Sequence, residues 1–297
     1  MPDNSAQRSD DDLLAGVRKG FEKSFMQTPL EQQIARCDGY ELVPLFERWL
    51  PDNQPILEAG CGSGRWVGWF LKHGWEAAGL DWSEALCARA RENLPAARFE
   101  SGDIRAMPFA DGEFGVVVSL GSVEHALEGP EPALREFYRV LRPGGIGIIS
   151  VPFNGPVRKT MRYLRWPAHR AKAIPWLRRA FGKPGWNGRS LRDAKRQSAV
   201  AADWTAVYRC GEQGWHFYEY HFAKVQMRSF ISRTGFQIIE EFVAIADEGV
   251  LQNFGRIAGR FHISEGRVRL SPIGKLLRML LPGRMVGHML VYVIRRD

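Results

Sequence analysis

The sequence predicts an α/β fold in which a parallel sheet is wound on both faces by helices. Short apolar runs of strand length alternate with helical patterns over residues 51–151. The run Ile56–Ala59 breaks into glycines at 60, 62 and 64 and then resumes with helical spacing, as expected where a buried strand turns into a helix. Two further runs end in or before an acid, at Asp81 and Asp103, a pattern typical of ligand-binding sheet edges.

The glycine-rich turn Gly60–Gly64 predicts a cradle for a nucleotide-like ligand. Glycine permits positive φ and close approach of a ligand, and the helix that follows presents free N–H groups to an anion. A dinucleotide fingerprint would need a glycine at 65, where this chain has Arg65. Glu58, two residues before the first glycine, is placed to bind a cationic group in the cleft. The alternative is an ordinary strand-to-helix loop.

Length and composition fit a single large domain or a domain with a sizeable insertion. The chain has 297 residues, of which 45% are hydrophobic and 25% charged. Its four cysteines show no metal-binding spacing, which indicates reduced thiols in a cytosolic protein. The sequence shows no apolar signal segment and no run of membrane-spanning length. We therefore expect a cytoplasmic protein.

Charge is distributed unevenly along the chain. Residues 1–153 hold 15 basic against 23 acidic side chains, residues 154–215 hold 14 against 3, and residues 216–297 hold 12 against 7. The net charge of +8 therefore originates in the second half, and mostly in residues 154–215. This basic segment is compatible with an acidic acceptor, an anionic membrane surface or RNA, and also with a solvated face that has no partner.

Ordered motifs between residues 58 and 145 resemble the class I S-adenosylmethionine-dependent methyltransferases, of the type that acts on small molecules. The acid of Glu58 followed by Gly-x-Gly-x-Gly is similar to their first motif, and Arg139–Gly145 (Arg-Val-Leu-Arg-Pro-Gly-Gly) is similar to another. The resemblance implies a seven-stranded sheet of order 3-2-1-4-5-7-6 with the last strand antiparallel. Its sixth and seventh strands would be Phe236–Ile245 and His288–Arg295.

The same resemblance implies S-adenosylmethionine as cofactor, with S-adenosylhomocysteine as product, and no metal. Asp81 would accept both ribose hydroxyls, although it could instead cap the next helix. Asp103 would bind the adenine amino group and Ile104 a ring nitrogen, although Gly-Asp is also a common turn. The expected cofactor-binding residues are Glu58, Gly60, Cys61, Gly62, Gly64, Asp81, Trp82, Asp103, Ile104 and Leu120.

We expect four segments. Residues 1–50 would form a tail and cover helices, 51–153 the cofactor-binding core, 154–215 a basic, tryptophan-rich lid, and 216–297 the rest of the core, starting with a helix over 216–235. Gly115 stands where the family usually has an acid, a small departure from the pattern.

Methyl transfer from a sulfonium is an in-line displacement that positioning alone largely accelerates. His125, just beyond the fourth strand Phe114–Leu120, is our candidate general base, although it could instead order the loop or contact the cofactor. The aromatic cluster Trp215–Phe222 either lines the acceptor pocket or packs the lid on the core. Its candidate acceptor residues are His216, Tyr218 and Tyr220.

The fourth strand is not followed by the Pro-Pro motif typical of amino methyltransferases that act on nucleobases or glutamine. We therefore expect a methyl acceptor oxygen or nitrogen on a small molecule, or on a glycan- or lipid-linked acceptor. Peripheral contact of residues 154–215 with the inner face of a membrane is a further expectation. The alternatives are an RNA methyltransferase that uses the basic segment, or an inactive cofactor-binding protein that engages membrane or nucleic acid.

Overall fold

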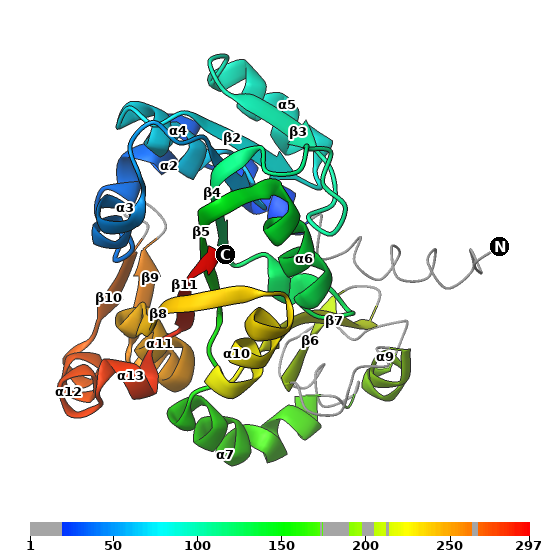
Figure 1. Ribbon diagram of the computed structural model, residues 1–297. Coiled ribbons are helices and arrows are strands. Elements are labelled where there is room, and N and C mark those ends of the chain that lie inside the picture. The colour runs from blue at the N-terminus through cyan, green and yellow to red at the C-terminus, as the bar shows by residue number, and fades with distance from the viewer. Residues whose placement is uncertain (1–19, 173, 175–189, 198–204, 212–213, 263–266) are drawn as a thin grey trace.

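The computed structural model describes residues 20–172, 174, 190–197, 205–211, 214–262 and 267–297, and is built around a seven-stranded sheet (Figure 1). Neighbouring strands are parallel except the last along the chain, which runs antiparallel to both of its neighbours. The predicted order is confirmed. From one edge to the other, the strands are Arg98–Ser101 (β3), Ala77–Asp81 (β2), Ile56–Ala59 (β1), Phe114–Leu120 (β4), Leu141–Pro152 (β5), Met289–Arg296 (β11) and Phe236–Ala244 (β8).

Helices cover both faces of this sheet, as predicted, and each face has its own hydrophobic core. One core is closed by Glu131–Val140 (α6) and Lys224–Arg233 (α10). The other is closed by Leu30–Cys37 (α2), Val43–Trp49 (α3), Arg65–Lys72 (α4) and Glu84–Asn93 (α5). Strands β1, β2 and β4 are mostly apolar because residues on both of their sides are buried, and their few polar residues include the buried acids Glu58 and Asp81.

Helix α4 is fixed by aromatic packing. Trp66 and Trp69 are each 1% exposed, and the ring of Phe46 on α3 lies 5.1 Å from that of Trp66 in an edge-to-face arrangement. Truncating a side chain of this size in a core costs about 3–5 kcal/mol. The helix that follows the glycine turn is therefore held in place independently of any ligand.

The expected helix over 216–235 is wrong in its first part. Gly214–His221 is a strand (β7) that pairs with Thr205–Gly211 (β6), and α10 begins only at Lys224. The alternation of buried Trp215 and Phe217 with half-buried neighbours has the period of two that a strand requires. The boundary expected between residues 215 and 216 falls inside β7.

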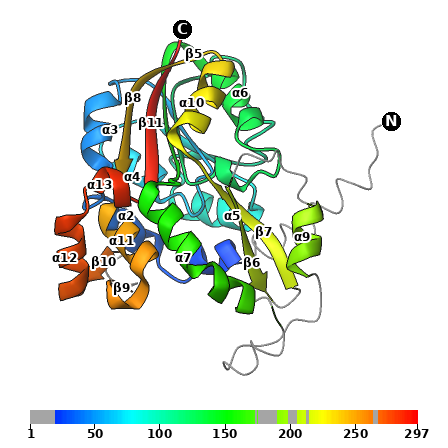
Figure 2. The same ribbon diagram turned by 90° about the horizontal axis from the view of Figure 1, so that it is seen from below.

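A small unit that the sequence did not predict lies between β8 and β11, at the orange and red end of the molecule in Figure 2. It has its own apolar cluster, centred on Val250, Ala258 and Val286. Its elements are Ala246–Phe254 (α11), Gly255–Ile257 (η2), Gly259–His262 (β9), Arg267–Leu270 (β10), Pro272–Leu280 (α12) and Gly283–Val286 (α13). We call residues 246–286 the C-terminal unit.

The described part of the basic segment contains Pro156–Lys172 (α7), Leu191–Gln197 (α9) and strand β6. The acidic tail 1–12 and most of the tryptophan-rich stretch lie outside the described residues. Among the helices that the structure describes, none combines the length and apolar character needed to cross a bilayer.

Candidate cofactor and acceptor site

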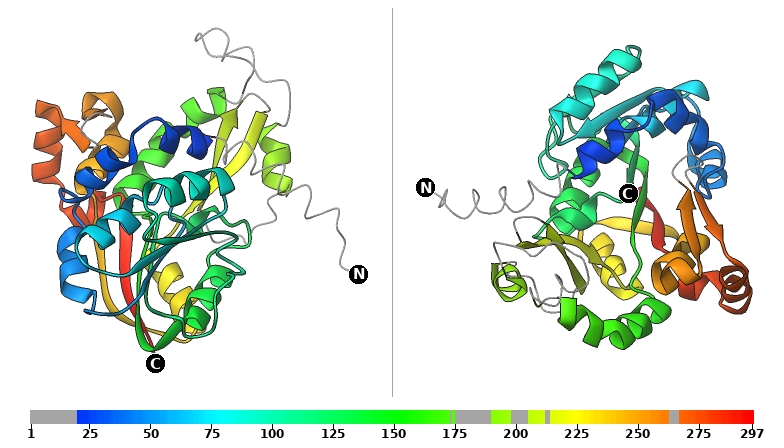
Figure 3. Two further views of the ribbon diagram at one scale, coloured as in Figure 1. Left: turned by 90° about the horizontal axis from the view of Figure 1, so that it is seen from above. Right: turned by 180° about the vertical axis from the view of Figure 1, so that it is seen from behind.

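The elements outside the sheet and its covering helices lie at one end of the strands. The left view of Figure 3 shows the first helical residues, the β6–β7 hairpin and the C-terminal unit at the end of the sheet opposite the mark for the C-terminus. Because β11 runs antiparallel to the parallel strands, the parallel strands β1 to β5 have their carboxyl ends there. Open α/β sheets bind their ligands at the carboxyl ends of their strands.

Asp81, the last residue of β2, holds the glycine turn against the sheet. Its carboxylate accepts hydrogen bonds from the backbone N–H of Gly62 (2.8 Å) and from that of Ser83 (3.0 Å). The side chain is buried, and this burial raises the pKa of Asp81. Asp81 therefore lies against the glycine turn, and its role in binding the ribose stays a prediction. The alternative role, in which Asp81 caps the next helix, is wrong, because Ser83 caps α5 through its hydroxyl.

The turn needs glycine for steric as well as conformational reasons. Gly60 has φ of 86°, and a Cβ on it would overlap the side chain of Ser122. Gly62 has φ of 55°, and its Cβ would lie 2.9 Å from the Phe25 ring. The backbone of the turn therefore packs closely against Ser122 and Phe25, and only glycine leaves the room that this packing requires.

Glu58, on β1, is a buried carboxyl group below the turn. It accepts a hydrogen bond from the N–H of Val67 (3.2 Å), at the start of α4. Burial raises the pKa of Glu58 to about 8, although the nearby Arg65 opposes this. At neutral pH the group therefore carries a proton, and a cationic ligand beside it would favour the release of that proton.

The first described helical turns cover the cradle, as expected for the N-terminal segment. Residues 20–26 are helical, and Glu22 accepts a hydrogen bond from the hydroxyl of Ser83 (2.7 Å). The ring of Phe21 lies 5.1 Å from that of His125, so one helix covers both the cofactor side and the candidate base. The sequence analysis did not single out Phe21 and Phe25, although their i, i+4 spacing places them on one helix face.

The other expected cofactor residues lie around this turn. Asp103 follows β3, and its carboxylate is bound by Arg105, whose guanidinium also reaches Glu128 (2.8 Å).

Trp82 is 36% exposed directly after β2, while Leu120 is half-buried at the end of β4. Cys61 is buried and Ile104 packs against the core at the β3 side.

His125 lies on the short helix Val123–His125 (η1), which follows β4. Its Nδ1 is 2.7 Å from the carbonyl oxygen of Tyr218 on β7. Only a protonated Nδ1 can donate to a carbonyl, which leaves Nε2 with a free lone pair. Burial lowers the pKa of His125, so the ring is neutral and Nε2 is available as a proton acceptor.

Two carboxyl groups accompany this histidine. Glu124 is 2% exposed, its Oε1 lies 4.0 Å from Nε2 of His125, and burial raises its pKa well above the usual range. Glu219 on β7 binds Nε2 of His221 (2.8 Å). One atom each of Glu124, His125 and Glu219 lie within 4.8 Å of one another, an arrangement that could also hold a metal ion.

A buried cationic cluster lies next to these carboxyl groups. Arg158 on α7 is 8% exposed, and its guanidinium lies 2.6 Å from Nδ1 of His288 and 3.4 Å from Nδ1 of His221. Arg162, one turn further along α7, reaches the same nitrogen of His221 (3.3 Å). Burial lowers the pKa of Arg158 to about 10 and that of His288 to about 3. In the described part of the chain, no carboxylate oxygen lies within 4 Å of either guanidinium.

The three candidate acceptor residues occupy different positions on β7. Tyr218 lies beside His125 and beneath the guanidinium of Arg209, 3.2 Å from the ring centre. His216 is half-buried further along the strand. Tyr220 is fully buried, and its hydroxyl donates to the carbonyl of Leu127 (2.9 Å). The geometry thus brings Tyr218, and not Tyr220, to the candidate base.

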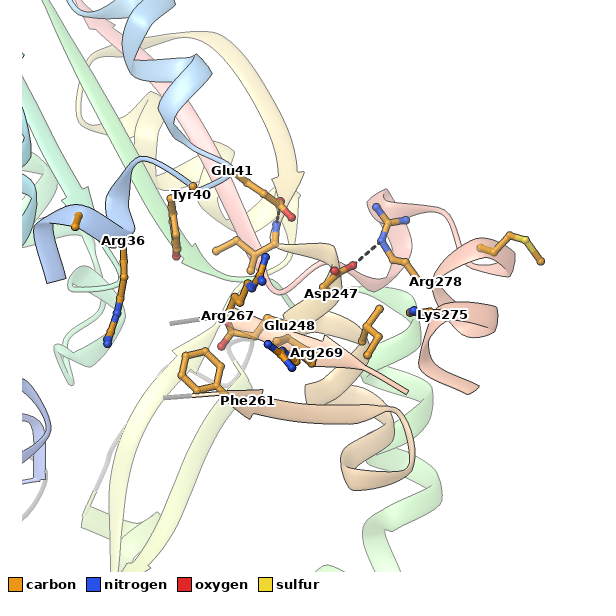
Figure 4. A pocket seen from close by; sticks show the side chains of 16 residues that line it. Arg36, Tyr40, Glu41, Asp247, Glu248, Phe261, Arg267, Arg269, Lys275 and Arg278 are labelled. Atoms are coloured by element: carbon orange, nitrogen blue, oxygen red, sulfur yellow. Dashed lines mark hydrogen bonds and ion pairs between the residues drawn. The ribbon is translucent and has the colours of Figure 1, made fainter. Parts of the chain in front are cut away.

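A large pocket of about 1200 Å³ lies between α2 and the C-terminal unit (Figure 4). Tyr40, on its wall, packs against Trp66 of α4, so the pocket adjoins the helix of the glycine turn. Ile245, which joins β8 to α11, has the left-handed φ of 58°, rare for a β-branched residue, and its N–H donates to Glu41 (2.6 Å). The charged residues around the pocket are Arg36, Glu41, Asp247, Glu248, Arg267, Arg269, Lys275 and Arg278.

Comparison with known proteins agrees with this geometry. A family model described as a methyltransferase domain matches residues 57–149, which run from β1 through β5. The chain carries a class I S-adenosylmethionine-dependent methyltransferase domain. S-adenosylmethionine is the cofactor of this domain. The glycine turn and the two buried acids beside it, Glu58 and Asp81, are chemically compatible with a ligand that carries a cation and hydroxyl groups.

Relatives of known name match the methyltransferase domain only in part. A malonyl-[acyl-carrier protein] O-methyltransferase of Erwinia pyrifoliae is 35% identical over 149 residues, which cover 46% of this chain and 55% of that protein. A demethylmenaquinone methyltransferase of Chlorobaculum parvum is 36% identical over 109 residues, 36% of this chain and 45% of that protein. The chain thus spans about half the length of these relatives.

Solved structures extend the likeness to most of the fold. A methyltransferase from Methanosarcina mazei aligns with a TM-score of 0.55 at 15% identity, and covers 86% of this chain and 98% of that one. One from Mesorhizobium loti aligns with a TM-score of 0.51 at 19% identity, over 87% and 99% of the two chains. At these identities the likeness concerns the fold alone.

Proposed function

We propose that this protein transfers a methyl group from S-adenosylmethionine to an oxygen of a small or carrier-linked acceptor that bears an anionic group. The observation that carries the proposal is the cluster of the buried Arg158 and the half-buried Arg162, whose hydrogen-bond partners are His221, His288 and Asn154 and include no carboxylate. A buried cation without a carboxylate partner is costly, and an anionic ligand would compensate it. Glu219 and His221 connect this cluster to His125, beside which the methyl acceptor would bind.

The residues of the cradle would bind the cofactor as the sequence suggests. Asp81 would accept the ribose hydroxyls, Asp103 the adenine amino group, and Glu58 would meet the cationic end of the methionine moiety. The sulfonium supplies an activated methyl group when the cofactor is bound. The covering helix with Phe21 and Phe25 would exclude water from the site, which favours displacement of a methyl group between aligned partners.

His125 would deprotonate an acceptor hydroxyl through Nε2, since Nδ1 donates to the carbonyl of Tyr218. A carboxylate acceptor would need no base, and His125 would then only orient it. The name of the Erwinia relative, an O-methyltransferase, supports oxygen rather than nitrogen as the methylated atom. Glycan- or lipid-linked acceptors fit the same site, and a cytoplasmic location is part of this proposal.

Calorimetric titration with S-adenosylhomocysteine tests the cofactor assignment. The wild type should bind, and Asp81→Ala should bind at least about 100-fold more weakly, because it loses both the ribose contact and the hydrogen bonds that shape the turn. Asp111→Ala, an exposed acid in a turn, is the matched control. A folded wild type that does not bind would contradict the proposal and favour a degenerate scaffold.

Proton release gives an independent measure of the role of Glu58. Titration with S-adenosylmethionine at pH 7, repeated in buffers of different ionisation enthalpy, should show release of a fraction of a proton, since the cation favours the ionised carboxylate. Glu58→Gln should abolish this release. Equal proton release in both proteins would place the cationic end of the cofactor elsewhere.

Formation of S-adenosylhomocysteine in the presence of small dicarboxylic acids and their thioesters tests the acceptor class. Arg158→Gln should lower kcat/KM for such acids at least about 100-fold, because it removes a charge-assisted hydrogen bond at a buried position. Its affinity for S-adenosylhomocysteine should stay that of the wild type. Unchanged kcat/KM in this variant would exclude the cluster from acceptor binding.

A further inference from the structure

The surface of the C-terminal unit carries an apolar helix face that points away from the core. On α12, Ile273 is 48% exposed, Leu276 50%, Met279 75% and Leu280 64%. At 100° per residue these four side chains fall within about a third of the helix circumference. The opposite side holds Gly274, packed against the backbone of Ala258. Leu277 of the same helix packs against the small apolar cluster of the unit. Helix α12 is therefore apolar on its exposed side as well as on the side that faces the core, where surface helices usually keep their apolar residues.

Neighbouring elements add further exposed apolar side chains, and the C-terminal unit is rich in basic residues, of which Arg278 is paired with Asp247. Ile257, at the end of η2, is 61% exposed, and Phe261, within β9, is 50% exposed. Within described residues 255–262 and 267–287 there is no acidic side chain. The basic residues of these two ranges are Arg256, Arg260, Arg267, Arg269, Lys275, Arg278 and Arg284.

We propose that this face binds the surface of an anionic lipid bilayer, with α12 lying in the plane of the headgroups. An exposed apolar stripe flanked by arginine and lysine is the chemistry of an interfacial helix, in which apolar side chains enter the acyl boundary while the cations meet lipid phosphates. A second copy of the chain is a poorer occupant, because it would bring two sets of these cations together. In Figure 2, α12 lies at the margin of the molecule.

The position of the pocket fits this assignment. Phe261 and Met279 belong to the exposed face and also line the pocket beside α2. The pocket therefore opens where the bilayer would lie, so that an acceptor embedded in lipid could approach the domain from the membrane side. This last step rests on the proposed function, whereas bilayer binding itself does not.

Vesicle flotation of the full chain tests the proposal. The protein should bind vesicles of equal parts phosphatidylglycerol and phosphatidylcholine, and should bind neither phosphatidylcholine alone nor the anionic vesicles at high salt. Leu276→Ser/Leu280→Ser should weaken binding at least about tenfold, because two inserting side chains are lost. Both positions are half-exposed or more, so the fold should tolerate the change.

Three comparisons make the result decisive. Val225→Ser, at a 72% exposed position on α10, should bind as the wild type does. Tyr163→Ser/Leu164→Ser removes the exposed apolar pair of α7 (81% and 63%), and loss of binding in this variant alone would assign the membrane contact to the basic segment and overturn the proposal. A dimer in sedimentation velocity that Leu276→Ser/Leu280→Ser dissociates would overturn it in favour of self-association. S-adenosylhomocysteine affinity, measured on every variant, separates these outcomes from failure of the proposed function.

Discussion

The cofactor side and the acceptor side of this site are built in different ways. On the proposed cofactor side, the binding groups are the backbone of one turn and the carboxyl groups of Glu58 and Asp81. All of them lie within 24 consecutive residues. On the proposed acceptor side, side chains converge from distant segments: Arg158 and His288 are 130 residues apart in the sequence, and their side-chain nitrogens lie 2.6 Å from each other. One side is a local motif, and the other is a product of tertiary structure.

This difference indicates which part of such a domain can be recognised from sequence and which part depends on its insertions. A cradle made of backbone depends on glycine and on a few hydrogen bonds, so it is recognisable in any sequence that keeps them. A cluster made of side chains from inserted segments changes with the insertions. The part that matches the methyltransferase family model accordingly lies in the acidic half of the chain.

The largest expected effect comes from breaking the cradle. Gly60→Ala should lower the free energy of unfolding by about 3 kcal/mol and abolish S-adenosylhomocysteine binding, because the new Cβ is both strained and overlapped by Ser122. Gly144→Ala is the matched control: φ is also positive, at 77°, but no atom lies within 4 Å, so only about 1 kcal/mol should be lost. Chemical denaturation measures both. Equal losses would show that strain alone, and not close packing, requires glycine at 60.

On the acceptor side, the pH dependence of stability should report the buried His288. Burial, aided by the nearby Arg158, lowers the pKa of His288 to about 3, so below pH 6.5 the unfolded chain binds more protons than the folded one. Stability from this group is therefore complete above pH 6.5 and falls as pH decreases, by about 2 kcal/mol at pH 5. His288→Gln should flatten the curve over this range.

Urea denaturation at pH 5, 6 and 7 would measure that slope. His73→Gln, at a partly exposed histidine that ends α4, serves as the control. If His288→Gln keeps the wild-type slope, the histidine is not held neutral by the cationic cluster, and the contrast between the two sides would weaken.

The covering helix should matter to a lesser degree. Phe25→Ala should weaken S-adenosylhomocysteine binding about tenfold, since the ring packs over the turn at Gly62 and its loss opens the cradle to water. Lys23→Ala, on the exposed side of the same helix, should change binding less than about twofold. Calorimetric titration measures the S-adenosylhomocysteine affinity of both variants. Similar affinities for the two variants would show that the helix covers the acceptor side only.

The smallest effect is expected at Arg105. Its guanidinium fixes the carboxylate of Asp103, so Arg105→Ala should weaken cofactor binding by about threefold through poorer positioning of the adenine ligand. Arg135→Ala removes a more exposed arginine–glutamate ion pair on α6 and should have no effect on binding. Tighter binding in Arg105→Ala would mean that the arginine competes with the adenine for Asp103.

Most of the fold was predictable because its seven strands are short apolar runs with clear ends. Strand β8 ends within one residue of its expected position, and β11 is displaced by one residue along the chain. Strand β7 was misassigned as helix because its aromatic residues fit either period, and only pairing with β6 decides between them. The C-terminal unit was missed because its strands of four residues depend on each other and on a small separate core.

The residues of the site also fall into those that the sequence identified and those that it did not. The sequence singled out Glu58, Asp81 and His125, which stand at or just beyond strand ends. It missed Arg158 because one arginine among fourteen basic residues of the segment carries no local sign that α7 buries it. It placed Tyr218 and Tyr220 together, although alternate positions of an irregular strand face different surroundings.

Strand β11 has a consequence for how the molecule assembles. It is the last strand along the chain, yet it lies between β5 and β8 inside the sheet. Until residues 289–296 have left the ribosome, β5 and β8 each lack this neighbour and expose an unpaired edge. Exposed edges invite pairing with other chains, so the nascent protein depends on rapid insertion of one late strand, or on a chaperone that shields the gap.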